Sequence, residues 1–266
     1  MMPYIDHPIA PGVTHIEEAP MGVCFTLLEG RDRALLVDTG YGLEDTAAHV
    51  RALLPQGKPL QVVLTHAHHD HALGALHFPS VWLLPAEEEN LRVYSNEKWR
   101  RHVLAGARSH GLAPEEAAFL AAPLPARSAP PASVDLGGLT AELIPLPGHT
   151  PGSLVVWVPE LALLLTGDDW NPCTWLFFPE ALPVGQYREN IRQLPALPFR
   201  QVLCSHRTGA YPREALVSFI EGLTDPVLQA AEPSPEGAPH GVTTCTAHPC
   251  PGQVLVFDRH KYIQEA

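Results

Sequence analysis

The sequence has few basic residues and no long apolar run. Seventeen Lys and Arg stand against twenty-nine Asp and Glu, a formal net charge of −12, which argues against a nucleic-acid partner held through its phosphates. No stretch approaches the ~18 consecutive apolar residues that a membrane-spanning helix needs. The opening residues, MMPYIDHPIAPG, lack the basic and then apolar segments of a secretion signal. We therefore expect a cytoplasmic protein with neither a membrane nor a nucleic-acid partner.

Cysteine is also scarce, with five residues scattered along the chain. An odd and widely spaced set does not form a disulfide framework, and a reducing compartment suits it. Charged residues make up 17% of the chain and hydrophobic residues 45%, which excludes a disordered or fibrous protein. With 266 residues the chain is long enough to bury a large core. We expect one domain over residues 1–266.

Short apolar runs between turn-forming residues predict a mixed α/β chain. The run Leu60–Thr65 is apolar and β-branched, as expected of a buried strand. Residues 86–122 are typical of a helical insertion, and 96–122 within it are a candidate lid. The composition of residues 231–252 predicts a linker, followed by a strand at Gln253–Asp258.

Histidine is unusually abundant, with fifteen residues, and its densest cluster follows that predicted strand directly. Four side chains that can bind a metal stand within six positions there: His66, His68, Asp70 and His71. In an extended segment His66 and His68 point the same way, because side chains alternate. Asp70 and His71 come where a helix can begin, so they can face a second point nearby. Imidazole nitrogen and carboxylate oxygen suit zinc, iron or manganese, and the segment therefore predicts a site for two adjacent metals.

The segment HAHHDH resembles the HxHxDH signature of the metallo-β-lactamase superfamily. Four further segments resemble the other motifs of that family in the same order: VDTGYG with Asp38, PGHTPGS with His149, TGD ending at Asp168, and CSH ending at His206. These matches lie between residues 34 and 206. The resemblance implies an α+β fold, a four-layer αββα sandwich, with a two-metal site at one edge of the sheets.

The resemblance also implies which side chains hold the metals and what surrounds them. The first metal takes His66, His68 and His149, the second takes Asp70, His71 and His206, and Asp168 bridges both. The expected cofactor is a pair of divalent ions, Zn²⁺ first, with Fe or Mn as alternatives. Asp38 is expected to order the loops behind the ligands through hydrogen bonds. His69, at the variable position of the motif, is expected to lie exposed or behind the ligands.

Residues close to the motifs are candidates for substrate contact. They are Tyr41, Trp170, Trp175, Arg207 and Tyr211. The aromatic residues after Asp168 stand in a stretch that reads as a polar-aromatic loop, residues 169–178. They have two interpretations, the lining of an apolar substrate pocket or a second core packed against the sheet.

Two further clusters also keep two interpretations each. The basic side chains of the insertion, Arg100 and Arg108 among them, either offer positive charge to an anionic substrate from a lid or form a solvated helix face. In the C-terminal part, Cys245 and Cys250 flank His248. Three candidate ligands at this loose spacing are either a small metal clip or ordinary residues.

The implied site points to hydrolysis. Two divalent ions a few ångströms apart lower the pKa of a bridging water from 15.7 to ~7, and the resulting hydroxide can attack a carbonyl. The ligand set resembles that of glyoxalase II, of lactonases and of phosphodiesterases in the superfamily. This implies a metal-dependent hydrolase of a small ester, thioester or lactone, with Asp70 and Asp168 as catalytic carboxylates.

Three alternatives remain open at this point. The same site is compatible with cleavage of a phosphodiester or, weakly, of a β-lactam. A similar ligand set around one iron is that of a persulfide dioxygenase. The third is a non-catalytic binding protein that the metal stabilises. In each case the expected partner is a small molecule, and a homodimer is compatible with the sequence.

Overall fold

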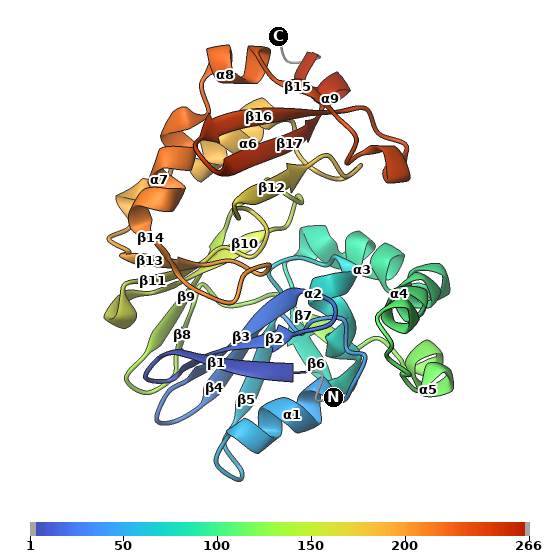
Figure 1. Ribbon diagram of the computed structural model, residues 1–266. Coiled ribbons are helices and arrows are strands. Elements are labelled where there is room, and N and C mark those ends of the chain that lie inside the picture. Colours follow the sequence, from blue (N-terminus) through green and yellow to red (C-terminus); the bar gives the residue numbers. More distant parts are fainter. Residues whose placement is uncertain (1–3, 264–266) are drawn as a thin grey trace. The chain divides into compact units, whose positions relative to one another are not determined.

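The chain forms two compact units, and the computed structural model describes residues 4–263 of it (Figure 1). Unit 1 consists of the residues up to Leu143 together with Ser205–Gly209. Unit 2 consists of Ile144–Cys204 and the residues from Ala210 onward. Each unit mixes helices and strands. None of the helices among the described residues is long and apolar enough to cross a membrane. That residues 1–266 make one domain stays a prediction.

The centre of unit 1 is a seven-stranded sheet whose strands follow one another in chain order. The strands are β1 (Tyr4–Ala10), β2 (Val13–Glu18), β3 (Val23–Glu29), β4 (Ala34–Val37), β5 (Leu60–Val63), β6 (Ser80–Trp82) and β7 (Ala126–Ser128). β1 to β4 pair antiparallel, and β4 to β7 pair parallel. Every residue of β4, ALLV, is buried, as expected of a strand that is covered on both faces. β8 (Ser133–Asp135) and β9 (Thr140–Pro145) follow as an antiparallel pair.

The parallel pair β4–β5 brings two loops to the same edge of this sheet. Its register pairs Val37 with Val63, so the residues that follow each strand emerge side by side. Asp38 donates its backbone N–H to the carbonyl of Val63 at 2.9 Å. Asp38 has a φ of 63°, a left-handed conformation that Asp adopts more readily than most residues. The segment with the predicted metal ligands therefore begins beside Asp38.

The helices of unit 1 are mostly short. They are α1 (Thr46–Leu53), α2 (His69–Ala72), α3 (Glu88–Tyr94), α4 (Glu97–Ser109) and α5 (Glu116–Ala121). α2 packs against α3 and α4, which lie in the predicted helical insertion (Figure 1). The side chain of Asn96 caps the start of α4 by accepting the backbone N–H of Trp99. The ligand-bearing α2 is thus held between the sheet loops and the insertion.

The basic residues Arg100, Arg101 and Arg108 have partners within the insertion, and that residues 96–122 form a lid stays a prediction. Arg100 is 6% exposed. Its guanidinium donates at 2.7 to 2.8 Å to the backbone carbonyls of Ser95, Phe119 and Ala122. Arg101 and Arg108 both pair with Glu116 of α5. These charges are therefore satisfied within the insertion, because each faces a carbonyl or a carboxylate of a neighbouring helix.

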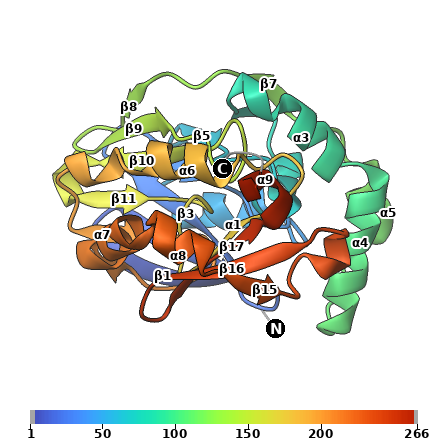
Figure 2. The same cartoon turned by 90° about the horizontal axis from the view of Figure 1, so that it is seen from above.

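Unit 2 contains two groups of paired strands. They are β10 (Leu154–Val158), β11 (Leu163–Leu165), β12 (Cys173–Leu176), β13 (Gln201–Leu203), β14 (Tyr211–Pro212), β15 (Glu232–Ser234), β16 (Thr244–Cys250) and β17 (Gln253–Asp258). One group has the order β14-β13-β11-β10 and the other β12-β17-β16-β15. The helices are α6 (Val184–Ile191), α7 (Arg213–Gly222), α8 (Asp225–Gln229) and α9 (Arg259–Ile263). Figure 2 shows α7 and α8 beside β16, against which both pack.

Two expectations for unit 2 are wrong because strand pairing overrides local composition. Residues 231–252, expected to be a linker, contain β15 and β16. Their Pro249 lies in the register shift of β16 between Ala247 and Cys250, where a strand tolerates proline. The stretch after Asp168, expected to be a loop, contains β12, which pairs in parallel with β17. The predicted strand Gln253–Asp258 is confirmed as β17, and it pairs with both β12 and β16.

Candidate metal centre

In unit 1 the loop after β5 carries His66 and His68. They are 1% and 4% exposed, and their ring centroids lie 4.7 Å apart. The buried carboxylate of Glu87 accepts the backbone N–H of Ala67, between them, at 3.0 Å. This bond fixes the extended backbone from which both imidazoles project. Sequence reasoning missed Glu87, because nothing in the run PAEEEN separates it from the two glutamates that follow.

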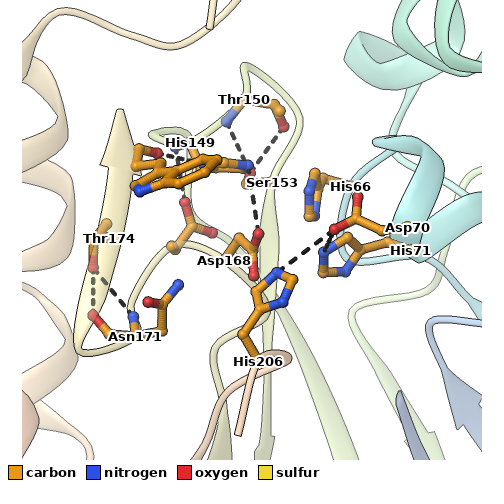
Figure 3. A network of polar contacts seen from close by, with 12 residues as sticks. His66, Asp70, His71, His149, Thr150, Ser153, Asp168, Asn171, Thr174 and His206 are labelled. Carbon is orange, nitrogen blue, oxygen red and sulfur yellow. Dashed lines mark hydrogen bonds and ion pairs between the residues drawn. The ribbon is translucent and has the colours of Figure 1, made fainter. Parts of the chain in front are cut away.

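A second group of side chains lies close by in the same unit. The ligand atoms of Asp70, His71 and His206 are all within 4.8 Å of one another. Oδ2 of Asp70 is 3.6 Å from Nε2 of His71 and 3.6 Å from Nε2 of His206 (Figure 3). Burial alone would raise the pKa of Asp70, but the imidazoles of His71, His69 and His206 hold it well below its usual range. The carboxylate is therefore ionised, as a metal ligand must be.

Asp38 is the hub of the hydrogen bonds behind these ligands. Its carboxylate accepts the backbone N–H of Thr65 at 2.7 Å, the hydroxyl of Thr65 at 2.8 Å and Nδ1 of His71 at 3.0 Å. Because the hydroxyl donates to Asp38, it accepts from Nδ1 of His66, 3.1 Å away. Both imidazoles therefore carry their proton on Nδ1 and present Nε2. Asp38 selects the tautomer of two ligand histidines from one position.

Two loops of unit 1 complete this arrangement. His206 belongs to the segment Ser205–Gly209, and its Nδ1 lies 3.3 Å from the carbonyl of Gly22, to which it donates. Glu18, fully buried, accepts the backbone N–H groups of Tyr41 and Leu43 at 2.7 and 3.3 Å. Burial raises the pKa of Glu18 to about 7. The loop that carries Asp38 is thus anchored by a carboxyl group about twenty residues away, which no local pattern reveals.

In unit 2 the turn before β10 carries His149, which is 1% exposed. Its backbone N–H donates to the carboxylate of Asp169 at 3.0 Å. Its Nδ1 lies 2.7 Å from the carbonyl of Trp175, so it donates there and leaves Nε2 as the ligand atom. Nε2 lies 3.9 Å from Oδ2 of Asp168 (Figure 3). Unit 2 therefore presents an imidazole and a carboxylate to the same point.

Asp168 stands at the end of β11 and is 9% exposed. The chain turns sharply there, because Gly167 has a φ of 54° and the hydroxyl of Thr166 donates to the carbonyl of Trp170 at 2.9 Å. The hydroxyl of Tyr187 donates to the carbonyl of Asp169 at 2.6 Å. This turn places the carboxylate of Asp168 beside Nε2 of His149 and the carboxylate of Asp169 at the backbone N–H of His149.

Two of the predicted substrate contacts belong to the core of unit 2. Trp170 is 0% exposed and packs among apolar side chains of that core. Its Nε1 donates to the side chain of Gln253 at 3.0 Å, and its ring meets that of Tyr211 edge-on at 5.6 Å. A substrate role for Trp170 is therefore wrong, since a fully buried ring does not meet a ligand. Tyr211 serves the same packing.

The other predicted contacts lie nearer to solvent. Trp175 is 37% exposed, Arg207 is exposed, and Tyr41 is half-buried. Their substrate roles stay predictions. The suggested C-terminal clip gains no support, because Cys245 is buried on β16 whereas His248 is exposed. Within residues 4–263, the groups of side chains that fit a metal do not include them.

The ligands that each unit offers are imidazole nitrogens and carboxylate oxygens. This donor set fits Zn²⁺, Fe²⁺ or Mn²⁺, which accept nitrogen and oxygen together. Four of the histidines, His66, His71, His149 and His206, are presented through Nε2, and carboxylates are placed beside them, as a divalent ion requires. The donor chemistry thus matches the metals that the sequence predicts.

Comparison with known proteins agrees with this chemistry. The family model described as Metallo-beta-lactamase superfamily matches residues 20–206. "Acyl-coenzyme A thioesterase MBLAC2" of Gallus gallus is 32% identical over 56% of this chain and 59% of its own length. "Hydroxyacylglutathione hydrolase" of Cereibacter sphaeroides is 31% identical over 65% of this chain and 58% of its own length. The chain thus matches less than two thirds of each relative.

Solved structures give the same answer for the fold. The protein TTHA1623, solved "in a di-iron-bound form", is 25% identical with a TM-score of 0.53, over 78% of this chain and 96% of that one. Together with the match over residues 20–206, this likeness confirms the predicted fold class.

Proposed function

Because the chain belongs to the metallo-beta-lactamase superfamily, we propose that it is a metal-dependent hydrolase that cleaves a small ester, thioester or lactone with a pair of divalent ions. The observation that carries the proposal is a shared tautomer. Four histidines donate Nδ1–H to an acceptor of their own unit and so present Nε2: His66, His71, His149 and His206. Histidines of an ordinary polar surface have no reason to share that orientation, whereas metal ligands do.

The ligand assignment follows the motifs. We assign His66, His68 and His149 to the first ion, Asp70, His71 and His206 to the second, and Asp168 to a bridging position. Each ion would thus have three ligands of its own and share Asp168, a set of nitrogen and oxygen donors that zinc accepts. We propose Zn²⁺ as the metal, and the relative in a di-iron-bound form makes iron the first alternative.

Among the three substrate classes, thioesters are favoured. The names of the two curated relatives describe hydrolysis of an acyl-coenzyme A and of a hydroxyacylglutathione, and both compounds are thioesters. When bound, two divalent ions lower the pKa of water to ~7 and polarise the carbonyl. The reaction joins the water oxygen to the acyl carbon and breaks the carbon–sulfur bond, and the thiol and the acid leave. Asp70 and Asp168 are assigned as the catalytic carboxylates because their negative charge would hold the ions in the site.

The test is metal analysis together with turnover on defined probes. Purified protein loaded with Zn²⁺ should hold two ions per chain and hydrolyse a simple acyl-coenzyme A or glutathione thioester faster than a phosphodiester or a β-lactam. Asp168→Ala should lose metal and turnover together. Asp225→Ala, at an exposed aspartate of α8, is the matched control and should keep both.

Other outcomes would contradict the proposal in distinct ways. A single iron per chain with oxygen consumption on glutathione persulfide would identify a dioxygenase. Full metal occupancy without turnover of any ester, thioester or lactone would identify a binding protein. Turnover that Asp168→Ala leaves intact would refute the ligand assignment.

A further inference from the structure

Five rings of unit 1 form a continuous cluster that begins at the ligand segment. This aromatic cluster consists of Tyr41, His69, Tyr94, Trp99 and His102. The ring of His69 lies at its centre, 4.8 Å from Trp99 and 5.6 Å from Tyr41, centroid to centroid. Trp99 in turn meets His102 edge-on at 5.4 Å. His69 directly precedes the proposed ligand Asp70 in the sequence, so the cluster lies next to the proposed metal site.

Two rings of the cluster stand at the margin of the packed side of α4. Trp99 and His102 are three residues apart on α4 and therefore share one face of that helix. Val103, one turn after Trp99, continues into the buried residues that pack α4 onto the rest of unit 1, with Leu104 and Ala107 further round the helix. Arg100 adds its bonds to backbone carbonyls from that packed side. Trp99, half-buried, and His102, exposed, thus extend the packed side of α4 to solvent.

The cluster runs from a buried base to an open side. Tyr94 is 6% exposed, and its ring meets that of the ligand His68 edge-on at 4.6 Å. Tyr41, His69 and Trp99 are half-buried, and His102 is exposed. A molecule that reaches the ligands from the side of α4 therefore passes along ring faces and edges.

The rings of the cluster suit contact with another ring. Tyrosine and tryptophan carry no charge at neutral pH, and the cations of α4 nearby are Arg101, which is paired with Glu97 and Glu116, and the exposed Lys98. Ring quadrupoles attract another ring in an edge-on or offset arrangement, at centroid distances of about 4.5 to 7 Å. The distances within the cluster lie in that interval, so its rings already pack on one another in this way, and the part of Trp99 that is open to solvent can add a contact with one further ring.

Resting on the proposed function, we propose that the aromatic cluster is a specificity-determining site that binds an aromatic ring of the substrate beside the metal ligands. The enzyme then prefers an aryl thioester to an alkyl thioester of equal size. Trp99 is the main contact, because it is half-buried and lies between His69 and His102.

The experiment compares matched substrates on the zinc-loaded full chain. Phenylacetyl and cyclohexylacetyl thioesters of N-acetylcysteamine differ only in the ring, and acetyl thioesters of benzyl and cyclohexylmethyl thiol place the same pair on the leaving side. In one of these pairs kcat/KM should favour the aryl member about threefold to tenfold, the range that an aromatic pair supplies. Trp99→Leu should bring that ratio close to one.

Two further tryptophans serve as controls. Trp82→Leu changes a half-buried tryptophan of β6 outside the cluster and should leave the ratio unchanged. Trp175→Leu is the competing variant, because Trp175 is the exposed aromatic side chain next to His149 in unit 2. The proposal is overturned if Trp99→Leu keeps the preference, or if Trp175→Leu alone removes it.

A binding measurement separates this proposal from the proposed function. Calorimetry on the zinc-loaded protein should give tighter binding of phenylacetate than of cyclohexylacetate, and Trp99→Leu should remove the difference. If no thioester is hydrolysed but this pattern holds, the proposed function fails and the aromatic site stands. If thioesters are hydrolysed without any aryl preference in turnover or binding, the aromatic site alone is refuted.

Discussion

Replacing Asp38 by Asn should weaken metal binding while leaving the backbone in place. Asn tolerates the left-handed φ of 63° at this position and keeps an oxygen that can accept the Thr65 N–H. Its amide nitrogen, however, takes the place of Oδ2 and meets Nδ1–H of His71, so that a donor faces a donor. His71 escapes this conflict by moving its proton to Nε2, and that is the atom that a metal needs.

The effect extends to a second histidine. The Thr65 hydroxyl donates to Oδ2 of Asp38 and accepts from Nδ1 of His66. An amide nitrogen in place of Oδ2 donates to this hydroxyl instead. The hydroxyl then donates to Nδ1 of His66, and the proton of that imidazole moves to Nε2 as well. A hydrogen bond to a charged group is worth ~1.5–3 kcal/mol. At 1.4 kcal/mol per factor of ten, each ion should therefore bind roughly 10- to 100-fold more weakly.

Competition with a chromophoric chelator measures both affinities. Asp38→Asn should weaken the binding of both ions. Thr65→Val removes only the hydroxyl that connects Asp38 to His66, so it should weaken the binding of the first ion more than that of the second. Circular dichroism of the metal-free proteins controls for folding. If Asp38→Asn binds two ions with the affinity of the unchanged protein, Asp38 does not select the tautomers and the reasoning is refuted.

Three more predictions test the scaffold. Arg100→Met leaves buried carbonyls without their donor and should lower the free energy of unfolding in urea by about 3 kcal/mol, whereas Arg101→Ala, at an exposed pair, should cost under ~1 kcal/mol. Gly148→Ala places a Cβ 2.6 Å from the ring of Tyr187 and should reduce metal content, whereas Gly209→Ala, with open space, should not. Glu18 binds its proton more tightly when folded, with a pKa of about 7 against 4.5, so its stabilising contribution is complete below pH ~4.5 and is lost as the pH rises through 7, by about 3 kcal/mol. In unfolding titrations across that interval Glu18→Gln should show a flatter pH dependence, and an unchanged slope would contradict the assignment.

The sequence predicts those parts of the site that depend on neighbouring residues. His66, His68, Asp70 and His71 stand in one short segment, and a strand before it fixes which side chains share a direction. The predicted strand Leu60–Thr65 agrees with β5, Leu60–Val63, apart from its last residues. The fold class follows from the order of the motifs, and the comparisons confirm it.

The supporting residues could not be predicted, because their partners are distant in the chain. Glu18 anchors the loop at Tyr41, and Glu87 pins the backbone at Ala67. Neither has a local pattern that distinguishes it from a surface glutamate. Trp170 is the reverse case, a residue that the sequence suggests for the site but the structure places in the core. An aromatic residue beside a ligand motif does not by itself indicate whether its ring faces the site or the core. Only the packed core decides that it faces inward.

The position of the segment Ser205–Gly209 in the chain determines when, during synthesis, the ligands of unit 1 become complete. It belongs with unit 1, although the residues on either side of it belong to unit 2. A nascent chain that has left the ribosome as far as Leu143 already carries four ligand side chains but not His206. Its second metal position cannot be completed until translation has passed through the first half of unit 2, Ile144–Cys204. Completion of that position is thereby placed late in biogenesis, and a product truncated before His206 is left without it.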